Sequence, residues 1–221
     1  MATVITQPWR PPSRREKGHS AGVVPEVDGW WHELNRLDVA GYAAIAATPT
    51  PVLDRVFRRV SRAADHWKLW LGSAGALAIV GGSRGRRSAV NGVAAMAVTS
   101  AVVHLALKPL GDRRRPDRNR YEVPLARQVS MPISTSFPSG HAASAAAFAT
   151  GVASAFPEAG IVLSAAAAIV SYSRVHTGVH YPVDVIAGTV IGTTLAQLAV
   201  AALDRGRNQR TAAPLLGPPG P

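Results

Sequence analysis

VIAGTVIGTTLAQLAVAAL, residues 185–203, is the segment that indicates most about the fold of this chain. It has no charged residue and reaches the roughly 20 residues that an α-helix needs to cross the hydrocarbon core of a bilayer. Its glycines, alanines and threonines are the small residues through which helices pack closely inside membranes. A second window, residues 88–107, has the same character. The two windows together predict an integral-membrane protein built from helices.

Shorter uncharged windows extend this prediction along the chain. Charged residues are also absent from 69–83 and 159–173, and from 128–157, whose second half is apolar. The first two windows span only about 22 Å as helix, so Trp67, Lys68 and Arg174 must help them to reach the interfaces. We therefore expect an all-α, integral-membrane helical bundle with five to six transmembrane helices. Five of these are expected near residues 67–83, 88–108, 140–156, 159–175 and 183–203.

A soluble bundle with alanine-rich buried helices is the alternative, but helices that are apolar all round are hard to solvate. The candidate for a sixth helix is 30–47, which has one polar edge and ends before Pro49. It could be a short span or an interfacial helix. Residues 52–65 form a basic amphipathic pattern, which suits either a helix on the membrane surface or a solvated helix that caps the bundle.

The two ends of the chain and its overall composition exclude further classes of protein and partner. Residues 1–28 and 206–221 have the proline, glycine and charge content of disordered tails. Residues 1–20 lack the apolar run of a signal peptide. With no cysteine, the chain has no disulfide, thiolate nucleophile or cysteine-bound metal. The net charge of +11 lies in the tails and between apolar windows without aromatic interleaving, so we expect lipid headgroups and an anionic substrate as partners, and no nucleic acid.

Three polar stretches beside the apolar windows carry the chemistry. In the first, Pro109 ends an apolar helix just after Lys108, and Arg115 follows before Pro116. Lysine supplies a point charge and arginine a planar fork for phosphate oxygens. The alternative is an ordinary positive juxtamembrane loop, formed by Arg113, Arg114, Arg115, Arg118 and Arg120.

The second stretch, Pro138-Ser139-Gly140-His141, stands where a polar loop enters an apolar helix. Ser139 is a natural N-cap and Gly140 allows close backbone approach. The amides of residues 139–141 would form an anion site at the helix N-terminus, with His141 beside it as a general acid.

The third stretch contains Ser173-Arg174, His180 and Asp184. A carboxylate four residues after His180 can bind one imidazole nitrogen and leave the other free to attack. Helix capping is the alternative reading of this pair, and His176 competes with His180 as the reactive histidine.

The joint pattern Lys-x6-Arg-Pro, Pro-Ser-Gly-His and Ser-Arg-x5-His-x3-Asp resembles the signature of the type 2 phosphatidic acid phosphatase superfamily. That superfamily includes lipid phosphate phosphatases, bacterial class A acid phosphatases and vanadium haloperoxidases. The resemblance covers about residues 33–203, and its x5 spacing selects His180 over His176. It implies a phosphatase domain over residues 29–205.

The resemblance also implies a role for each motif residue. His180 would attack phosphorus to give a phosphohistidine, Asp184 would orient it, and His141 would protonate the leaving alkoxide. The phosphate oxygens would be held by Lys108, Arg115, Ser139, the Gly140 amide and Arg174. No metal and no cofactor is implied, because three cations and backbone donors can stabilise phosphoryl transfer.

The expected activity is metal-independent hydrolysis of a lipid phosphate or diphosphate at the cell membrane. Phosphatidic acid, phosphatidylglycerol phosphate, polyprenyl diphosphate and polyprenyl-phosphoryl sugar phosphates all stay open as substrates, and no oligomeric state is indicated. A vanadate-dependent haloperoxidase and a non-catalytic lipid-phosphate binding or transport protein are the alternatives. We expect the active site on the extracytoplasmic side, because arginines at the opposite helix ends would then be cytoplasmic. These are Arg84, Arg86, Arg87, Arg205, Arg207 and Arg210.

Overall fold

The computed structural model describes residues 27–212, and within this range it is helical with no strand. The all-α prediction is therefore confirmed. Among the described residues, three helical stretches are long and apolar enough to cross a membrane: Gly82–Leu110, Pro157–His176 and Pro182–Gln209. The elements are α1 (Val27–Ala47), α2 (Pro51–Ala63), the 3₁₀ turn η1 (Asp65–Trp67), α3 (Lys68–Val80), α4 (Gly82–Val102), the π segment η2 (Val103–Leu107), α5 (Lys108–Leu110), α6 (Gly140–Ala153), α7 (Pro157–His176) and α8 (Pro182–Ala212).

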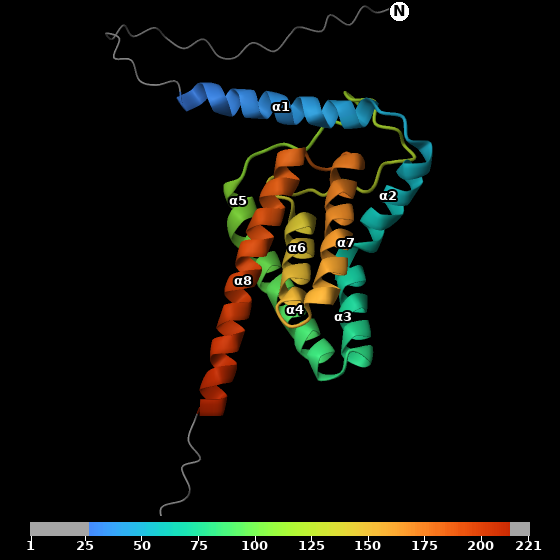
Figure 1. The fold of residues 1–221 in the computed structure, drawn as a ribbon. Helices are drawn as coiled ribbons and strands as arrows, with labels where there is room; N and C mark the ends of the chain where they lie inside the picture. The colour runs from blue at the N-terminus through green and yellow to red at the C-terminus, as the bar shows by residue number, and fades with distance from the viewer. Residues whose placement is uncertain (1–26, 213–221) are drawn as a thin grey trace, which may run out of the picture.

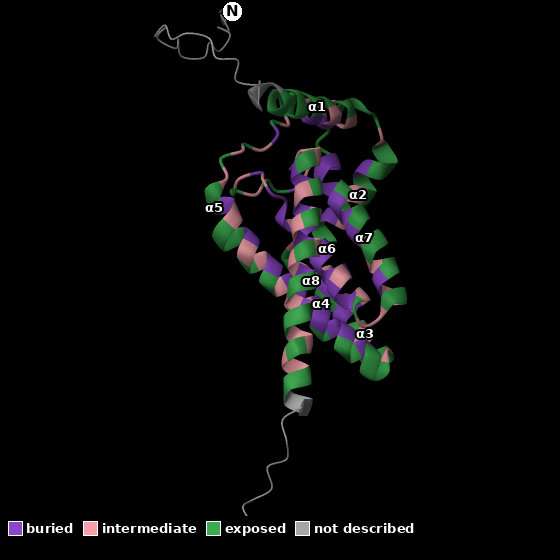
Figure 2. Ribbon diagram, turned by 60° about the vertical axis from the view of Figure 1, so that its left-hand side comes forward, coloured by how far each residue is buried: buried purple, intermediate pink, exposed green. Residues whose placement is uncertain are grey.

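Helix α6 is the centre of the bundle, with α4, α7 and α8 packed around it and α3 against α4 (Figure 1). Its sequence is rich in alanine, and nearly all of its residues are buried (Figure 2). The neighbouring helices approach through glycines. A Cβ added to Gly192 of α8 would lie 2.1 Å from the Ala143 carbonyl oxygen, and one added to Gly92 of α4 would lie 2.8 Å from Val152. Small residues therefore set the helix spacing around α6.

Helix α1 lies across one end of the bundle instead of running beside the other helices (Figures 1 and 2). Its C-terminal connection to α2 is held by Arg127, which is fully buried. Arg127 donates hydrogen bonds to the carbonyl oxygens of Ile45 (3.0 Å) and Thr48 (2.9 Å) and to the Asp54 carboxylate (2.9 Å). The predicted amphipathic helix 52–65 corresponds to α2, which packs along α7.

Helices α4 and α8 are longer than predicted, because the charged residues at their ends form ion pairs. Helix α4 begins at Gly82 and not near residue 88, with Arg84 bonded to Glu158 and Arg87 to Asp204. Helix α8 continues to Ala212, where Arg207 also pairs with Asp204 one turn away. The prediction of a disordered tail is thus wrong for residues 206–212, and residues 27–28 are helical as well. The rest of both predicted tails lies outside the described residues.

Candidate active site

All three motifs reach the same end of the bundle, the end that α1 crosses (Figure 1). Lys108 follows the π segment at the end of α4, Gly140 begins α6, Arg174 lies in the last turn of α7, and Asp184 lies in the first turn of α8. The long connection between α5 and α6 supplies Arg115 and the residues before α6.

Lys108 and Arg115 converge on one backbone carbonyl. Lys108 Nζ donates to the Thr135 oxygen at 2.8 Å, and Arg115 Nη2 donates to the same oxygen at 3.1 Å. Arg115 Nε also donates to the Ser134 oxygen at 2.8 Å. Burial lowers the pKa of Arg115 to about 10, so its guanidinium is still charged at physiological pH. Two cations thus stand side by side, with a neutral carbonyl as their shared partner.

His180 is only 2% exposed and stands between a cation and a carboxylate. Arg115 Nη1 lies 3.1 Å from His180 Nε2, and Asp184 Oδ2 lies 3.5 Å from His180 Nδ1. Because an arginine can only donate, Nε2 presents its lone pair and Nδ1 carries the proton. Burial lowers the pKa of His180 to about 3, with the Asp184 hydrogen bond opposing and the Arg115 charge assisting. The imidazole is therefore neutral, as a nucleophile must be.

Asp184 is fully buried and is held by more than the predicted histidine. Its carboxylate accepts hydrogen bonds from the Tyr181 amide at 2.9 Å, from Arg113 Nη1 at 2.7 Å and from the Ser136 hydroxyl. The second arm of the Arg113 guanidinium donates to Asp38 on α1. The interpretation of Arg113 as a residue of an ordinary positive loop is therefore wrong. It links α1 to the carboxylate that contacts His180.

The N-terminus of α6 is built as predicted, with one difference. The Ser139 hydroxyl accepts from the Ala142 amide at 3.5 Å, which is N-cap geometry. The Ser139 amide, however, donates to the Asp184 carbonyl oxygen at 2.9 Å, so it does not join an anion site. A Cβ at Gly140 would lie 3.1 Å from the His104 ring, which would have to move by a few tenths of an ångström, so glycine keeps the ring close to the α6 N-terminus.

His141 and Arg174 meet at a carboxylate that the sequence did not single out. His141 Nε2 lies 3.0 Å from Asp65 Oδ1, and Arg174 Nη1 lies 3.7 Å from the same oxygen. The His141 hydrogen bond and the Arg174 charge lower the pKa of Asp65. Arg174 is 1% exposed and its Nε is buried without a hydrogen-bond partner. A buried guanidinium with an unused donor is suited to receive an oxyanion.

His176, the competing histidine, lies elsewhere. Its Nε2 is 2.9 Å from Asp54 Oδ1, in the cluster that Arg127 forms behind α1 and α2. His176 therefore stabilises the packing of α2 against α7 through Asp54. Within residues 27–212, no group of three or more histidine, aspartate or glutamate side chains is arranged to hold a metal ion.

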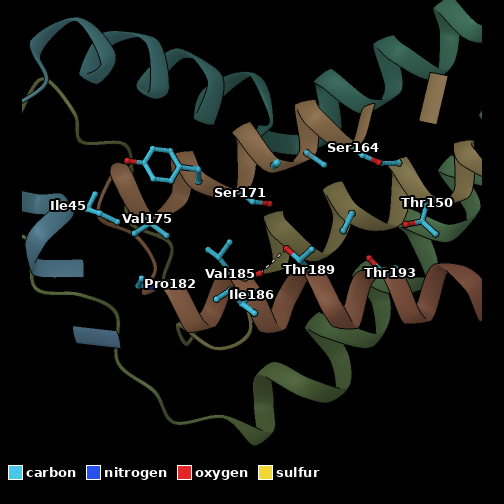
Figure 3. Close-up of a pocket in the computed structure, with 15 residues that line it drawn as sticks. Ile45, Thr150, Ser164, Ser171, Val175, Pro182, Val185, Ile186, Thr189 and Thr193 are labelled. Atoms are coloured by element: carbon cyan, nitrogen blue, oxygen red, sulfur yellow. Dashed lines mark hydrogen bonds between the residues drawn. The ribbon is translucent and has the colours of Figure 1, made fainter. Parts of the chain in front are cut away.

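Two cavities flank α6 near this site. An apolar groove of about 620 Å³ runs between α7 and α8 and is lined on α6 by Ala146, Ala149 and Thr150 (Figure 3). A smaller cavity of about 290 Å³ touches Gly140, His141 and Ser144. At 3.6 residues per turn, the two sets of residues occupy opposite faces of α6.

Comparison with known proteins places these features in a family. The family model described as the PAP2 superfamily matches residues 89–207. The chain is 33% identical over 165 residues to decaprenylphosphoryl-5-phosphoribose phosphatase from Mycobacterium tuberculosis, covering 71% of this chain and 86% of that protein. It is also similar to the crystal structure of Aquifex aeolicus LpxE, with a TM-score of 0.60 and 25% identity over 75% of this chain and 95% of that one. A transmembrane PAP2-type phosphatidylglycerolphosphate phosphatase from Bacillus subtilis shares the fold, with a TM-score of 0.59 and 21% identity over 82% and 89% of the two chains.

Proposed function

Because the chain belongs to the PAP2 superfamily and is a phosphatase, we propose that it hydrolyses a lipid phosphate or diphosphate at a membrane surface. The carrying observation is the convergence of Lys108, Arg115 and Arg174 with the His180–Asp184 pair at one end of apolar helices. The ends of membrane-spanning helices lie at the level of the lipid headgroups. Phosphoryl transfer needs chiefly an aligned nucleophile and positive charge spread around the phosphate oxygens.

The proposed reaction has two steps. His180 Nε2 attacks phosphorus, so a P–N bond forms while the bond to the leaving oxygen breaks and His141 gives that oxygen its proton. Water then attacks the phosphohistidine with His141 as the base, and phosphate and free His180 result. Asp184 holds the Nδ1 proton of His180 throughout, so the attacking lone pair stays on Nε2.

The cations would hold the phosphate during both steps. Arg115 already contacts His180 Nε2, and rotation of its fork from the Thr135 oxygen would direct two donors to phosphate oxygens. Lys108 shares that carbonyl and can be redirected in the same way. Arg174 and the amides at the start of α6 would complete the set, since the first amides of a helix have no intrahelical partner.

For the membrane arrangement, we propose that α3 and α6 span together with the three long apolar helices, which gives five spans, while α1 lies in the interface. Support comes from α1 crossing the bundle end, where the motif residues also lie (Figure 1). The opposite end carries Arg84, Arg86 and Arg87, close to Asp204 of α8. By the positive-inside rule this end is cytoplasmic, so the active site faces outward.

The test is phosphate release by detergent-solubilised protein from a panel of lipid phosphates. His180→Ala is expected to abolish turnover because no other group can form the phosphoryl intermediate. The matched control is His32→Ala, at an exposed position on α1. Full turnover by a folded His180→Ala protein, judged by an unchanged thermal unfolding transition, would contradict the mechanism.

A further inference from the structure

The smaller cavity is lined by His141, the proposed acid for the leaving group. In-line displacement at phosphorus puts the leaving oxygen opposite the attacking His180 Nε2, and His141 must reach that oxygen to protonate it. His141 lines the 290 Å³ cavity, together with Gly140 at the start of α6. The apolar groove of Figure 3 lies on the opposite face of α6, away from His141.

The lining of the cavity is polar and aromatic. It is made by His66 and Trp67 from η1, Trp70 from α3, Ser100 from α4, His104 from the π segment and Ser144 from α6. Imidazoles and hydroxyls supply donors and acceptors at several angles, and indole rings supply flat apolar faces. Such a lining fits a hydroxylated ring better than a hydrocarbon chain.

Two backbone irregularities shape this cavity. His66 and Trp67 are left-handed, with φ of 55° and 61°, which is rare for residues with bulky side chains. His104 lies in the π segment Val103–Leu107, and π bulges inside α-helices occur frequently at functional sites. Strain of this kind persists at binding sites because the surrounding structure holds it. Both irregular segments contribute side chains to the same cavity.

The hydrogen bonding of His104 leaves its other nitrogen for a ligand. Its Nδ1 lies 2.9 Å from the Ser100 carbonyl oxygen, so Nδ1 is the donor. The Nε2 side of the ring faces Gly140, where an added Cβ would be 3.4 Å away. With Nδ1 as the donor, Nε2 beside the α6 N-terminus can accept a hydrogen bond from a hydroxyl group that is close to a bound phosphate.

We propose that this cavity binds a sugar ring, so that the phosphate removed is a sugar phosphate on a lipid carrier. The proposal rests on the proposed function and narrows its substrate class. A volume of about 290 Å³ lies near the lower end of the range for small-molecule pockets, about 300–1,000 Å³, and suits one ring. His104 accepts from a ring hydroxyl and Trp67 packs against the ring face. His66 and His104 are exposed, so the cavity has solvent-accessible walls.

The test measures kcat/KM for three lipids: decaprenylphosphoryl-5-phosphoribose, phosphatidylglycerol phosphate and phosphatidic acid. The wild-type protein is expected to prefer the sugar phosphate. His104→Ala and Trp67→Leu are each expected to lower kcat/KM for the sugar lipid about 3- to 10-fold more than for phosphatidic acid. This is the range of one neutral hydrogen bond for His104 and of one aromatic packing contact for Trp67. His32→Ala and Trp31→Leu, at exposed positions of α1, are the matched controls and should leave the ratio unchanged.

The outcomes separate the two proposals. Equal losses on all three lipids, or a wild-type preference for phosphatidylglycerol phosphate or phosphatidic acid, would overturn the sugar site and leave the lipid phosphatase standing. No phosphate release by the wild-type protein from any of the lipids would overturn both. Stabilisation of each variant by inorganic phosphate in thermal unfolding shows that the phosphate site is intact, so a loss of sugar preference then reports on the cavity alone.

Discussion

Replacing Arg113 should damage both stability and catalysis, although this residue lies outside the three motifs. Its guanidinium donates to Asp184 at 2.7 Å and to Asp38, whose side chains are 0% and 1% exposed. Arg113→Ala leaves two buried carboxylates without their cation. Breaking a buried ion pair in this way costs about 3–5 kcal/mol. In a chain of this size, that corresponds to a decrease in melting temperature of about 6–20 °C.

The same substitution should lower kcat, because Asp184 orients His180. A displacement of about 1 Å in a reacting group can cost about 100-fold in rate. Arg113→Lys keeps the charge but loses the fork, so it should retain one of the two contacts and fall between Arg113→Ala and wild type. The assays are thermal unfolding and phosphate release from the same detergent-solubilised protein.

The control is Arg114→Ala, because Arg114 is the exposed neighbour in the same arginine run. It should change neither quantity appreciably, as expected for a surface charge. If Arg113→Ala and Arg114→Ala have equal melting temperatures and equal kcat, the role of Arg113 as the support of Asp184 is refuted.

Three further predictions follow from the same site. Asp65→Asn should lower kcat on lipid phosphates by 10-fold or more with little change in KM, because His141 loses the carboxylate that orients it; an unchanged kcat would exclude that role. Inorganic phosphate at 100 times its Kd should stabilise the folded wild-type protein by about 2.7 kcal/mol, seen as a higher melting temperature, and should not do so in Arg174→Ala; equal stabilisation of both would argue against Arg174 as a ligand. Burial lowers the pKa of His180 from 6.5 to about 3. Between pH 6.5 and pH 3, the unfolded chain therefore binds a proton at this histidine that the folded chain does not bind, so the free energy of unfolding decreases as the pH falls. The melting temperature should therefore decrease more steeply from pH 7 to pH 5 in the wild type than in His180→Gln, and parallel curves would refute this.

The parts of the fold that could be predicted from sequence are those set by local pattern. Uncharged windows located the helices of the bundle, since a membrane or an all-round core excludes charge. Motif spacing brought out His180 and Asp184, which are four residues apart on one chain segment. Helix ends were predicted less well. The arginines at the start of α4 fall in a predicted loop, because their partners Glu158 and Asp204 lie in other parts of the sequence. Arg207, in the predicted tail, likewise bonds to Asn91 of α4.

The residues that support the catalytic set were missed for the same reason. Asp38 and Asp65 precede their partners Arg113 and His141 by 75 and 76 positions, and Ser136 precedes Asp184 by 48. Neither hydrophobic periodicity nor a short motif can predict contacts between residues so far apart in the sequence. Only the packing of α1 across the bundle end and the η1 turn beside α6 bring these side chains to the site.

The close packing of α6 has a consequence for the timing of events in each catalytic cycle. Gly192 of α8 lies against the Ala143 backbone, and Gly151 of α6 lies against the Asn91 and Gly92 backbone of α4. These close backbone contacts restrict sliding and rotation of α6. In the proposed mechanism, the amides at the N-terminus of α6 therefore already point toward the phosphate position when a substrate binds. The N–H dipoles of these amides are oriented when the chain folds, so no reorganisation of them is needed during each turnover. In the proposed mechanism, the alanines and glycines of this helix therefore set the alignment of the amides that bind the phosphate.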